Sequence, residues 1–209
     1  SINNNENICI LGDYDVDGAC STSLLIRYFS HINQKHFFYI PDRISDGYGA
    51  SKKLFQKLLL KKPKLVIMVD CGSTSNEAIA YLNKHNIKSI IIDHHEINKP
   101  YPKSDAIINP KKEFIKKENS LLCATALTYF FIEIIIKKTK SNFKISNFLI
   151  YVLLATICDV MPLRKINKII AHNTIDNFKI QNNLALNHIF EQFNLKKKLT
   201  IDDLGFLIG

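Results

Sequence analysis

ICILGDYDVDG (residues 8–18) places a short apolar, β-branched run directly before three closely spaced aspartates. A continuous apolar run of this length, bounded by turn-forming residues, is typical of a strand buried on both faces of a parallel sheet. Two later stretches, LVIMVDCGS (65–73) and SIIIDHHE (89–96), repeat the pattern and end at acidic or imidazole side chains. Because open α/β sheets bind ligands beyond the carboxyl ends of their strands, these three runs predict carboxylates and imidazoles gathered at one sheet edge.

Helical periodicity alternates with strand-like runs through the first half of the chain. Two more strands are predicted over residues 36–41 and 106–110, and helices are predicted over 20–32, 52–62 and 75–86. Strands that alternate with helices of about 10–15 residues predict an α/β fold with a doubly wound parallel sheet.

From about residue 119 onward the pattern is helical only, which predicts an all-helical segment after the sheet. The two most apolar stretches, 121–136 and 147–163, each carry an acidic residue and fall short of the ~20 clean apolar residues of a membrane span, so both are predicted to be buried helices. Further helices are predicted over 167–180 and 184–193. With no N-terminal secretion signal in the sequence, we expect a cytoplasmic protein.

The chain has 209 residues and a formal net charge of +9, from 28 lysines and arginines against 19 aspartates and glutamates. Such an excess suits a polyanionic partner. Lysines greatly outnumber arginines, however, so the excess also fits a compositional bias of the genome. The cysteines form no CxxC pair and are expected to be reduced packing thiols at positions 9, 20, 71, 123 and 158.

The polar residues at the strand ends suggest a site for divalent cations. Carboxylates from several elements, joined by an imidazole, favour Mn²⁺ or Mg²⁺ over zinc. Two such ions ~3.5–4 Å apart, bridged by a shared carboxylate, activate a water and stabilise the leaving oxygen of a phosphoester. Plainer readings exist for single residues, since a DxD pair is common in turns and Asp159 could cap the turn before Pro162. The candidate residues are Asp13, Asp15, Asp70, His94, His95 and Asp159.

Four phrases, in order, resemble the motifs of the DHH phosphoesterase superfamily: DYDVDG (13–18), VDCGS (69–73), DHH (93–95) and ATICDVMPL (155–163). Further phrases are similar to its RecJ branch, whose members are bacterial single-strand-specific 5′-to-3′ DNA exonucleases of recombination and repair. These phrases are IPDRISDGYGAS (40–51), DAIINP (105–110), LCATALTYFF (122–131) and LGFLIG (204–209).

The resemblance implies a role for each matching residue. His95 would face the scissile phosphate, and Asp93 would lie behind the imidazoles and fix their tautomer. Asp17 matches a motif position but is equally well explained as a helix cap, and Leu11 stands where some relatives have histidine. Asp70 would bridge two ions, Mn²⁺ or Mg²⁺. The implied metal ligands are Asp13, Asp15, Asp70, His94 and Asp159.

The resemblance also implies a division into a DHH-type metal-binding phosphoesterase domain over residues 1–163 and a helical connector over 164–209. We expect the connector to lead to a second domain, outside this chain, that would form the other wall of the DNA groove. The expected partner is single-stranded DNA, bound by a monomer without membrane attachment, and a single-strand-binding protein or a helicase is a candidate further partner.

The leading hypothesis is a metal-dependent exonuclease on single-stranded DNA. Within the superfamily, the alternatives are a phosphodiesterase for short oligonucleotides or cyclic dinucleotides, and an inorganic pyrophosphatase. A non-catalytic replication scaffold is less favoured, because all the expected acidic ligands are present. A non-catalytic nucleotide-binding module is also less favoured, because neither GxGxxG nor a P-loop follows the first strand.

Overall fold

The computed structural model describes residues 1–47, 49–112, 121–179, 183–192 and 198–209. Its strands form a sheet of order β2-β1-β3-β4-β5 in which every neighbouring pair is parallel. The α/β fold with a doubly wound parallel sheet is therefore confirmed. The strands are β1 (Ile8–Leu11), β2 (His36–Tyr39), β3 (Leu65–Val69), β4 (Lys88–Ile92) and β5 (Ala106–Ile108).

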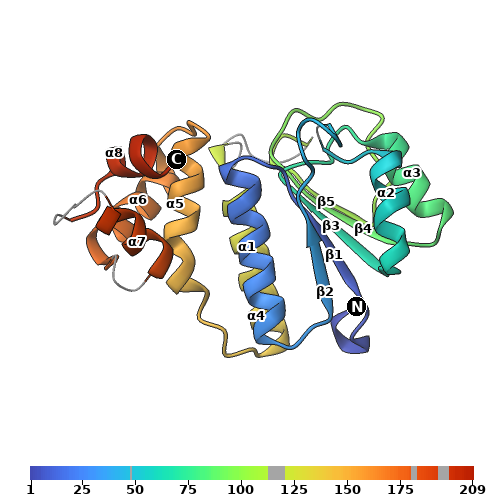
Figure 1. The fold of residues 1–209 in the computed structure, drawn as a ribbon, viewed down its shortest axis with the longest axis horizontal. Helices are drawn as coiled ribbons and strands as arrows, with labels where there is room; N and C mark the ends of the chain where they lie inside the picture. The colour runs from blue at the N-terminus through green and yellow to red at the C-terminus, as the bar shows by residue number, and fades with distance from the viewer. Residues whose placement is uncertain (48, 113–120, 180–182, 193–197) are drawn as a thin grey trace.

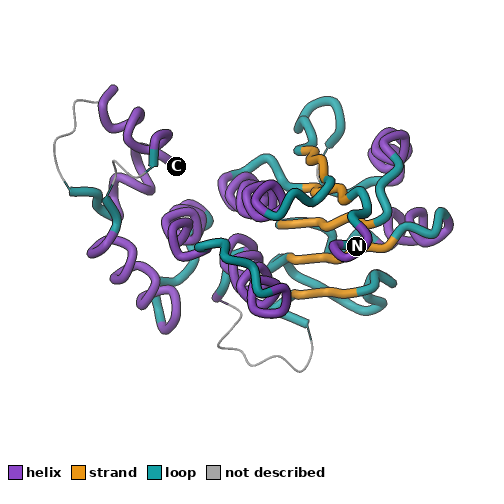
Figure 2. The backbone as a smooth tube through the Cα atoms, turned by 90° about the horizontal axis from the view of Figure 1, so that it is seen from below, coloured by secondary structure: helices purple, strands orange, loops and turns teal. Residues whose placement is uncertain are grey.

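Alternate residues of each strand pack on opposite faces of the sheet. In β1, Ile8 and Ile10 join the apolar cluster of α1 and α4, whereas Cys9 and Leu11 join the cluster of α2 and α3. Both faces are thus covered by helices, as Figures 1 and 2 show, which explains why the strands read as continuous apolar runs. The helices are α1 (Val16–His31), α2 (Lys52–Leu58), α3 (Asn76–Lys84) and α4 (Ala124–Thr139).

The remaining helices form a further layer on the side of α1 and α4 that faces away from the sheet (Figure 1). α5 contacts both α1 and α4, so it is the element that joins this layer to the α/β part. No helix in the described residues combines the length and apolarity needed to span a membrane. The layer contains α5 (Leu149–Cys158), α6 (Lys165–Asn177), α7 (Leu184–Gln192), α8 (Ile201–Asp203) and a final π-helical turn (Leu204–Ile208).

The strand order reverses between β1 and β3. From β1 the chain moves outward to β2, then crosses back to β3 and continues to β5 on the other side. Helices leave the two adjacent strands toward opposite faces at such a point, which opens a crevice beyond their carboxyl ends. The loops that follow β1 and β3 carry Asp13, Asp15 and Asp70, so the fold itself brings these residues to one place.

Several helix boundaries differ from the prediction, and two of the differences affect the placement of the aspartates. The helix predicted over 147–163 ends at Cys158, because Val160 has a left-handed φ of 54° and Pro162 follows it. Asp159 therefore lies at the C-cap of α5 instead of inside a helix.

The first helix begins four residues earlier than predicted, at Val16 rather than at residue 20. Asp15 is its N-cap, and the Asp15 carboxylate accepts a hydrogen bond from the Gly18 N–H at 2.9 Å. Three predicted positions, Tyr48 of the RISDGYG phrase and residues 180 and 193 at two helix ends, lie outside the described residues. The division between residues 163 and 164 stays a prediction.

Candidate metal centre

The loop after β1 turns sharply to present its aspartates. A Cβ atom at Gly18 would lie 2.4 Å from the Asp13 carbonyl oxygen and 2.6 Å from the Asp13 nitrogen, so only glycine lets α1 begin this close to the loop. Asp13 is buried, and burial raises the pKa of its carboxyl. Asp15 is exposed, and its carboxylate lies beside those of Asp13 and Asp70. Both residues of the DxD pair therefore bring their carboxylates to Asp70 from the loop after β1.

Asp70 is the central residue of the site. It follows β3 with a left-handed φ of 60°, a conformation that aspartate adopts more readily than most residues. The residue is 1% exposed, and no described group donates a hydrogen bond to either carboxylate oxygen. Burial, followed by the negative charges of Asp17 and Asp15, raises the pKa of Asp70 far above its ordinary value. Among the described residues, Asp70 thus lacks the hydrogen bonds that a buried charge requires.

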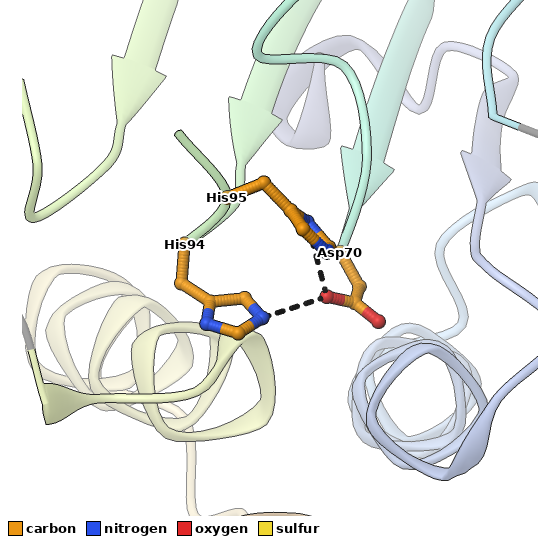
Figure 3. A group of neighbouring side chains, drawn as sticks. All are labelled: Asp70, His94 and His95. Atoms are coloured by element: carbon orange, nitrogen blue, oxygen red, sulfur yellow. Dashed lines mark ion pairs between the residues drawn. The ribbon is translucent and has the colours of Figure 1, made fainter. Parts of the chain in front are cut away.

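The two histidines after β4 both approach Asp70 (Figure 3). His94 Nε2 lies 3.3 Å from Asp70 Oδ1, and His95 Nδ1 lies 3.8 Å from the same oxygen. His94 is buried, and its Nε2 has no hydrogen-bond partner among the described residues, although Asp159 Oδ2 is 3.5 Å away. Asp70 and Asp159, 89 positions apart in the sequence, therefore meet at one imidazole nitrogen.

Asp93 lies behind the second imidazole. Its Oδ1 accepts a hydrogen bond from His95 Nδ1 at 2.8 Å, and its Oδ2 accepts one from the Ser73 N–H at 3.0 Å. Burial alone would raise the pKa of Asp93, but these hydrogen bonds outweigh it and hold the pKa well below its usual range. The bond to Asp93 in turn raises the pKa of His95. The half-exposed ring of His95 is thus held by an ionised carboxylate.

Asp17, which the sequence left open between a motif residue and a helix cap, caps a helix in the structure. Its carboxylate is 1% exposed and accepts hydrogen bonds from the N–H groups of Ala124 and Thr125, each at 2.7 Å. These are the first two residues of α4, whose N-cap residue Cys123 offers no side-chain acceptor. Asp17 therefore caps a helix more than 100 positions away, while its Oδ2 lies 3.6 Å from His94 Nε2. No local sequence pattern signals this pairing.

The residues present fit divalent cations that prefer oxygen and imidazole ligands. In the part of the chain that the structure describes, ligand atoms within 4.8 Å of one another form three groups, and Asp70 belongs to two of them. A cation shared by these carboxylates would supply the compensation that Asp70 lacks. Burial raises the pKa of the neighbouring Cys71 thiol well above its ordinary value, which disfavours a thiolate ligand. The groups are Asp13–Asp15–Asp70, Asp70–His94–His95 and Asp17–His94–Asp159.

Leu11, which stands where some relatives have histidine, and two further histidines lie outside the groups of ligand atoms. Leu11 packs in the apolar cluster of α2 and α3, so its side chain belongs to the core. His31 hydrogen-bonds Asn142, and His36 bonds the carbonyl oxygen of Gln34. These interactions account for both rings without a ligand.

Comparison with known proteins identifies similar chains. The model of the DHH family, N-terminal domain, matches residues 7–157. The single-stranded-DNA-specific exonuclease RecJ of Haemophilus influenzae is 29% identical over 217 residues, covering 98% of this chain and 37% of that protein. The exonuclease of the same name from Bacillus subtilis is 27% identical, covering 98% of this chain and 25% of that protein. This chain therefore spans about a third or less of the length of these relatives.

A crystal structure of exonuclease RecJ bound to manganese has the same fold. It superposes with a TM-score of 0.86 at 21% identity, covering 99% of this chain and 52% of the other.

Proposed function

This chain belongs to the DHH family, and we propose that it carries the metal centre of a single-stranded-DNA-specific exonuclease that hydrolyses phosphodiester bonds with Mn²⁺ or Mg²⁺. The observation that carries the proposal is Asp70, a buried carboxylate that has no hydrogen bond from the described residues and belongs to two groups of ligand atoms. The substrate is taken from the RecJ relatives, which are named for this activity and align with nearly the whole chain.

The residues have distinct proposed roles. Bound cations lower the pKa of a water molecule and stabilise the charge of the leaving oxygen. Asp70 is the proposed bridge between two ions, since it is shared by the group around Asp13 and the group around His94. The proposed ligands are Asp13, Asp15, Asp70, His94 and Asp159.

His95 is proposed to act on the scissile phosphate rather than on a cation. Asp93 orients the ring through Nδ1, and the raised pKa of His95 favours the protonated imidazole. We assign the Nε2–H group to a phosphate oxygen, where it stabilises the negative charge that develops in the transition state. Asp93 acts only through His95.

The test compares the full-length wild-type protein with its Asp70→Asn variant on labelled DNA in Mn²⁺. We expect the wild type to degrade a single strand from its 5′ end and to leave the matching duplex intact. Loss of a hydrogen-bond partner of a metal ligand lowers activity by up to roughly 100-fold. Because Asp70 is itself a proposed ligand of both ions, Asp70→Asn should lower the rate by more than that. Asp202→Asn, at an exposed position on α8, is the matched control and should keep full activity.

The same assay includes a dinucleotide and inorganic pyrophosphate. Turnover of either, without turnover of long single strands, would replace the exonuclease by a small-substrate phosphodiesterase or a pyrophosphatase. Full activity of Asp70→Asn would show that Asp70 is not a ligand of the catalytic metal ions.

A further inference from the structure

The edge of the sheet opposite the metal centre carries a row of lysines. Lys35 and Lys64 directly precede β2 and β3, Lys88 is the first residue of β4, and backbone hydrogen bonds hold this edge in register. The Lys88 N–H donates to the Lys64 carbonyl oxygen at 3.1 Å, and the Ile8 N–H donates to the Lys35 carbonyl oxygen at 3.1 Å. Lys64 and Lys88 are at the starts of neighbouring strands, which are ~4.8 Å apart, and β1 separates them from Lys35, so all three lie along one edge of the sheet.

Two more lysines extend this row. The first is Lys61, whose carbonyl oxygen accepts a hydrogen bond from the Asn7 side-chain amide at 2.8 Å, and the second is the next residue, Lys62. The Asn7 backbone carbonyl in turn accepts the Lys64 N–H at 2.9 Å, so Asn7 connects this pair to the row. All five side chains are exposed, and none forms an ion pair within the described residues. We call this set the lysine row: Lys35, Lys61, Lys62, Lys64 and Lys88.

Two acidic residues lie near the lysine row, and both have other partners. Glu6 Oε2 accepts a hydrogen bond from the Ser1 hydroxyl at 2.7 Å, and the Asp105 carboxylate accepts the Ser89 N–H at 2.8 Å. The charges of Lys88 and Lys64 contribute, after the Ser1 hydrogen bond, to the lowered pKa of Glu6. The row therefore keeps an excess of positive charge, which attracts polyanions.

The edge strand β2, which begins directly after Lys35, carries two adjacent phenylalanines. Lys61 Nζ is 4.9 Å from the centre of the Phe37 ring, and Phe38, on the opposite face of the strand, is 51% exposed. Phe38 is three residues after Lys35, and an exposed ring near lysines suits single-stranded nucleic acid, whose bases stack on rings while lysines bind phosphates. An acidic peptide would need only the charges.

We propose that the lysine row and Phe38 form a second binding surface for single-stranded nucleic acid, which contacts phosphates and stacks one base without reading sequence. The lysine row lies at the amino ends of the strands, near the N label in Figure 1, and Phe38 lies further along the edge strand β2, whereas the metal centre lies at the carboxyl ends. The proposal rests on the proposed function for the identity of the polymer, but it requires no hydrolysis. A strand held at this edge would raise the local concentration of substrate at the metal centre.

The test measures binding of a fluorescent oligothymidylate to the chain in EDTA, which separates binding from catalysis. The variant Lys35→Glu/Lys64→Glu/Lys88→Glu is compared with Lys138→Glu/Lys144→Glu/Lys168→Glu, which changes the net charge equally at exposed lysines on other elements. We expect the first variant to bind at least tenfold more weakly at low salt, and the second to change affinity less than threefold. Loss of three phosphate contacts should also lower the slope of log K against log[salt] by about 2.

Phe38→Leu tests the stacking contact and should weaken binding to oligothymidylate severalfold while leaving binding to inorganic polyphosphate unchanged. Equal weakening by both lysine variants would show that net charge alone attracts DNA, and unchanged binding by the first would exclude the surface. Tighter binding of polyglutamate than of oligothymidylate would assign the surface to an acidic protein partner instead. None of these outcomes depends on nuclease activity, so failure of this proposal and failure of the proposed function are distinguishable.

Discussion

Two buried aspartates beside the same imidazole are compensated in opposite ways. Asp17 receives two backbone hydrogen bonds from the start of α4, whereas Asp70 receives none from the described residues. Without a cation, the negative charge of Asp17 is therefore stabilised by the fold and that of Asp70 is not. The two residues should respond with opposite sign when each carboxylate is replaced by an amide.

Asp70→Asn should leave the metal-free protein at least as stable as the wild type, with a gain on the order of 1 kcal/mol at pH 7, because the wild type must keep a proton on Asp70 that the unfolded chain releases, and asparagine is neutral in both states. Asparagine also tolerates the left-handed backbone at this position. Urea denaturation in EDTA measures the difference. Mn²⁺ at about 100 times its dissociation constant should stabilise the wild type by ~2.7 kcal/mol and the variant by much less. A variant that Mn²⁺ stabilises as strongly as the wild type would contradict the assignment.

The raised pKa of Asp70 also predicts a pH dependence. Above the ordinary pKa of 3.8 the unfolded chain releases this proton while the folded protein keeps it, so metal-free stability should fall as the pH rises through the neutral range. Asp70→Asn should make that decline shallower. Burial raises the pKa values of Asp13 and Asp159 as well, so part of the decline should remain. Denaturation midpoints in EDTA between pH 5 and 8 provide the comparison.

Asp17→Asn should destabilise the metal-free protein by about 1–2 kcal/mol, because an amide can accept only one of the two N–H groups and presents a donor to the other. Hydrogen exchange at Ala124 and Thr125 should accelerate, since these amides lose their acceptor. Asp202→Asn, on the exposed surface, serves as the control and should change stability by less than ~0.5 kcal/mol. Unchanged stability of Asp17→Asn in EDTA would show that the cap contributes nothing and would favour Asp17 as a metal ligand.

At the scale of elements, the turn from β1 into α1 depends on the absence of a side chain at Gly18. Gly18→Ala should push α1 away from the Asp13 backbone, cost about 1–3 kcal/mol of stability and weaken Mn²⁺ binding. Gly47→Ala is the control. Its Cβ would meet no atom within 4 Å, so only its left-handed φ of 79° opposes the change and the cost should be nearer 1 kcal/mol, with normal metal affinity. Calorimetric titration with Mn²⁺ and thermal melting would separate the two effects.

The strands could be predicted because burial on both faces makes them continuous apolar runs that end in turn-forming residues. The clustering of Asp13, Asp70 and His94 could be predicted for the same reason, since parallel strands deliver their carboxyl ends to one edge. The end of α5 could not be predicted from the sequence, because Val160 adopts a left-handed conformation that is rare for a β-branched residue. The capping of α4 by Asp17 could not be predicted either, because only the tertiary fold brings Asp17 and the start of α4 together.

At the scale of the molecule, the metal centre joins two layers that otherwise contact each other through helices. Asp13, Asp15, Asp70 and His94 come from the loops at the sheet edge, whereas Asp159 comes from the end of α5 in the helical layer. A cation that binds both sets would hold α5 to the sheet more firmly than packing against α1 and α4 does alone. Metal binding should therefore tighten the junction between the layers as well as fill the site.

Hydrogen exchange with and without Mn²⁺ can detect this tightening. The amides of Asp159 and Met161 donate to the carbonyl oxygens of Ala155 and Thr156 at 2.9 Å each, so they report opening of the α5 terminus. We expect Mn²⁺ to slow their exchange more than tenfold. The exchange rates of the amides of residues 80–84, at the far end of α3, should change less than threefold if these amides exchange by local opening. Asp159→Asn should abolish the effect at α5 while leaving Mn²⁺ binding by the sheet-edge ligands detectable. Equal protection of both segments would mean that the cation stabilises the protein only globally, and that Asp159 does not connect the helical layer to the metal.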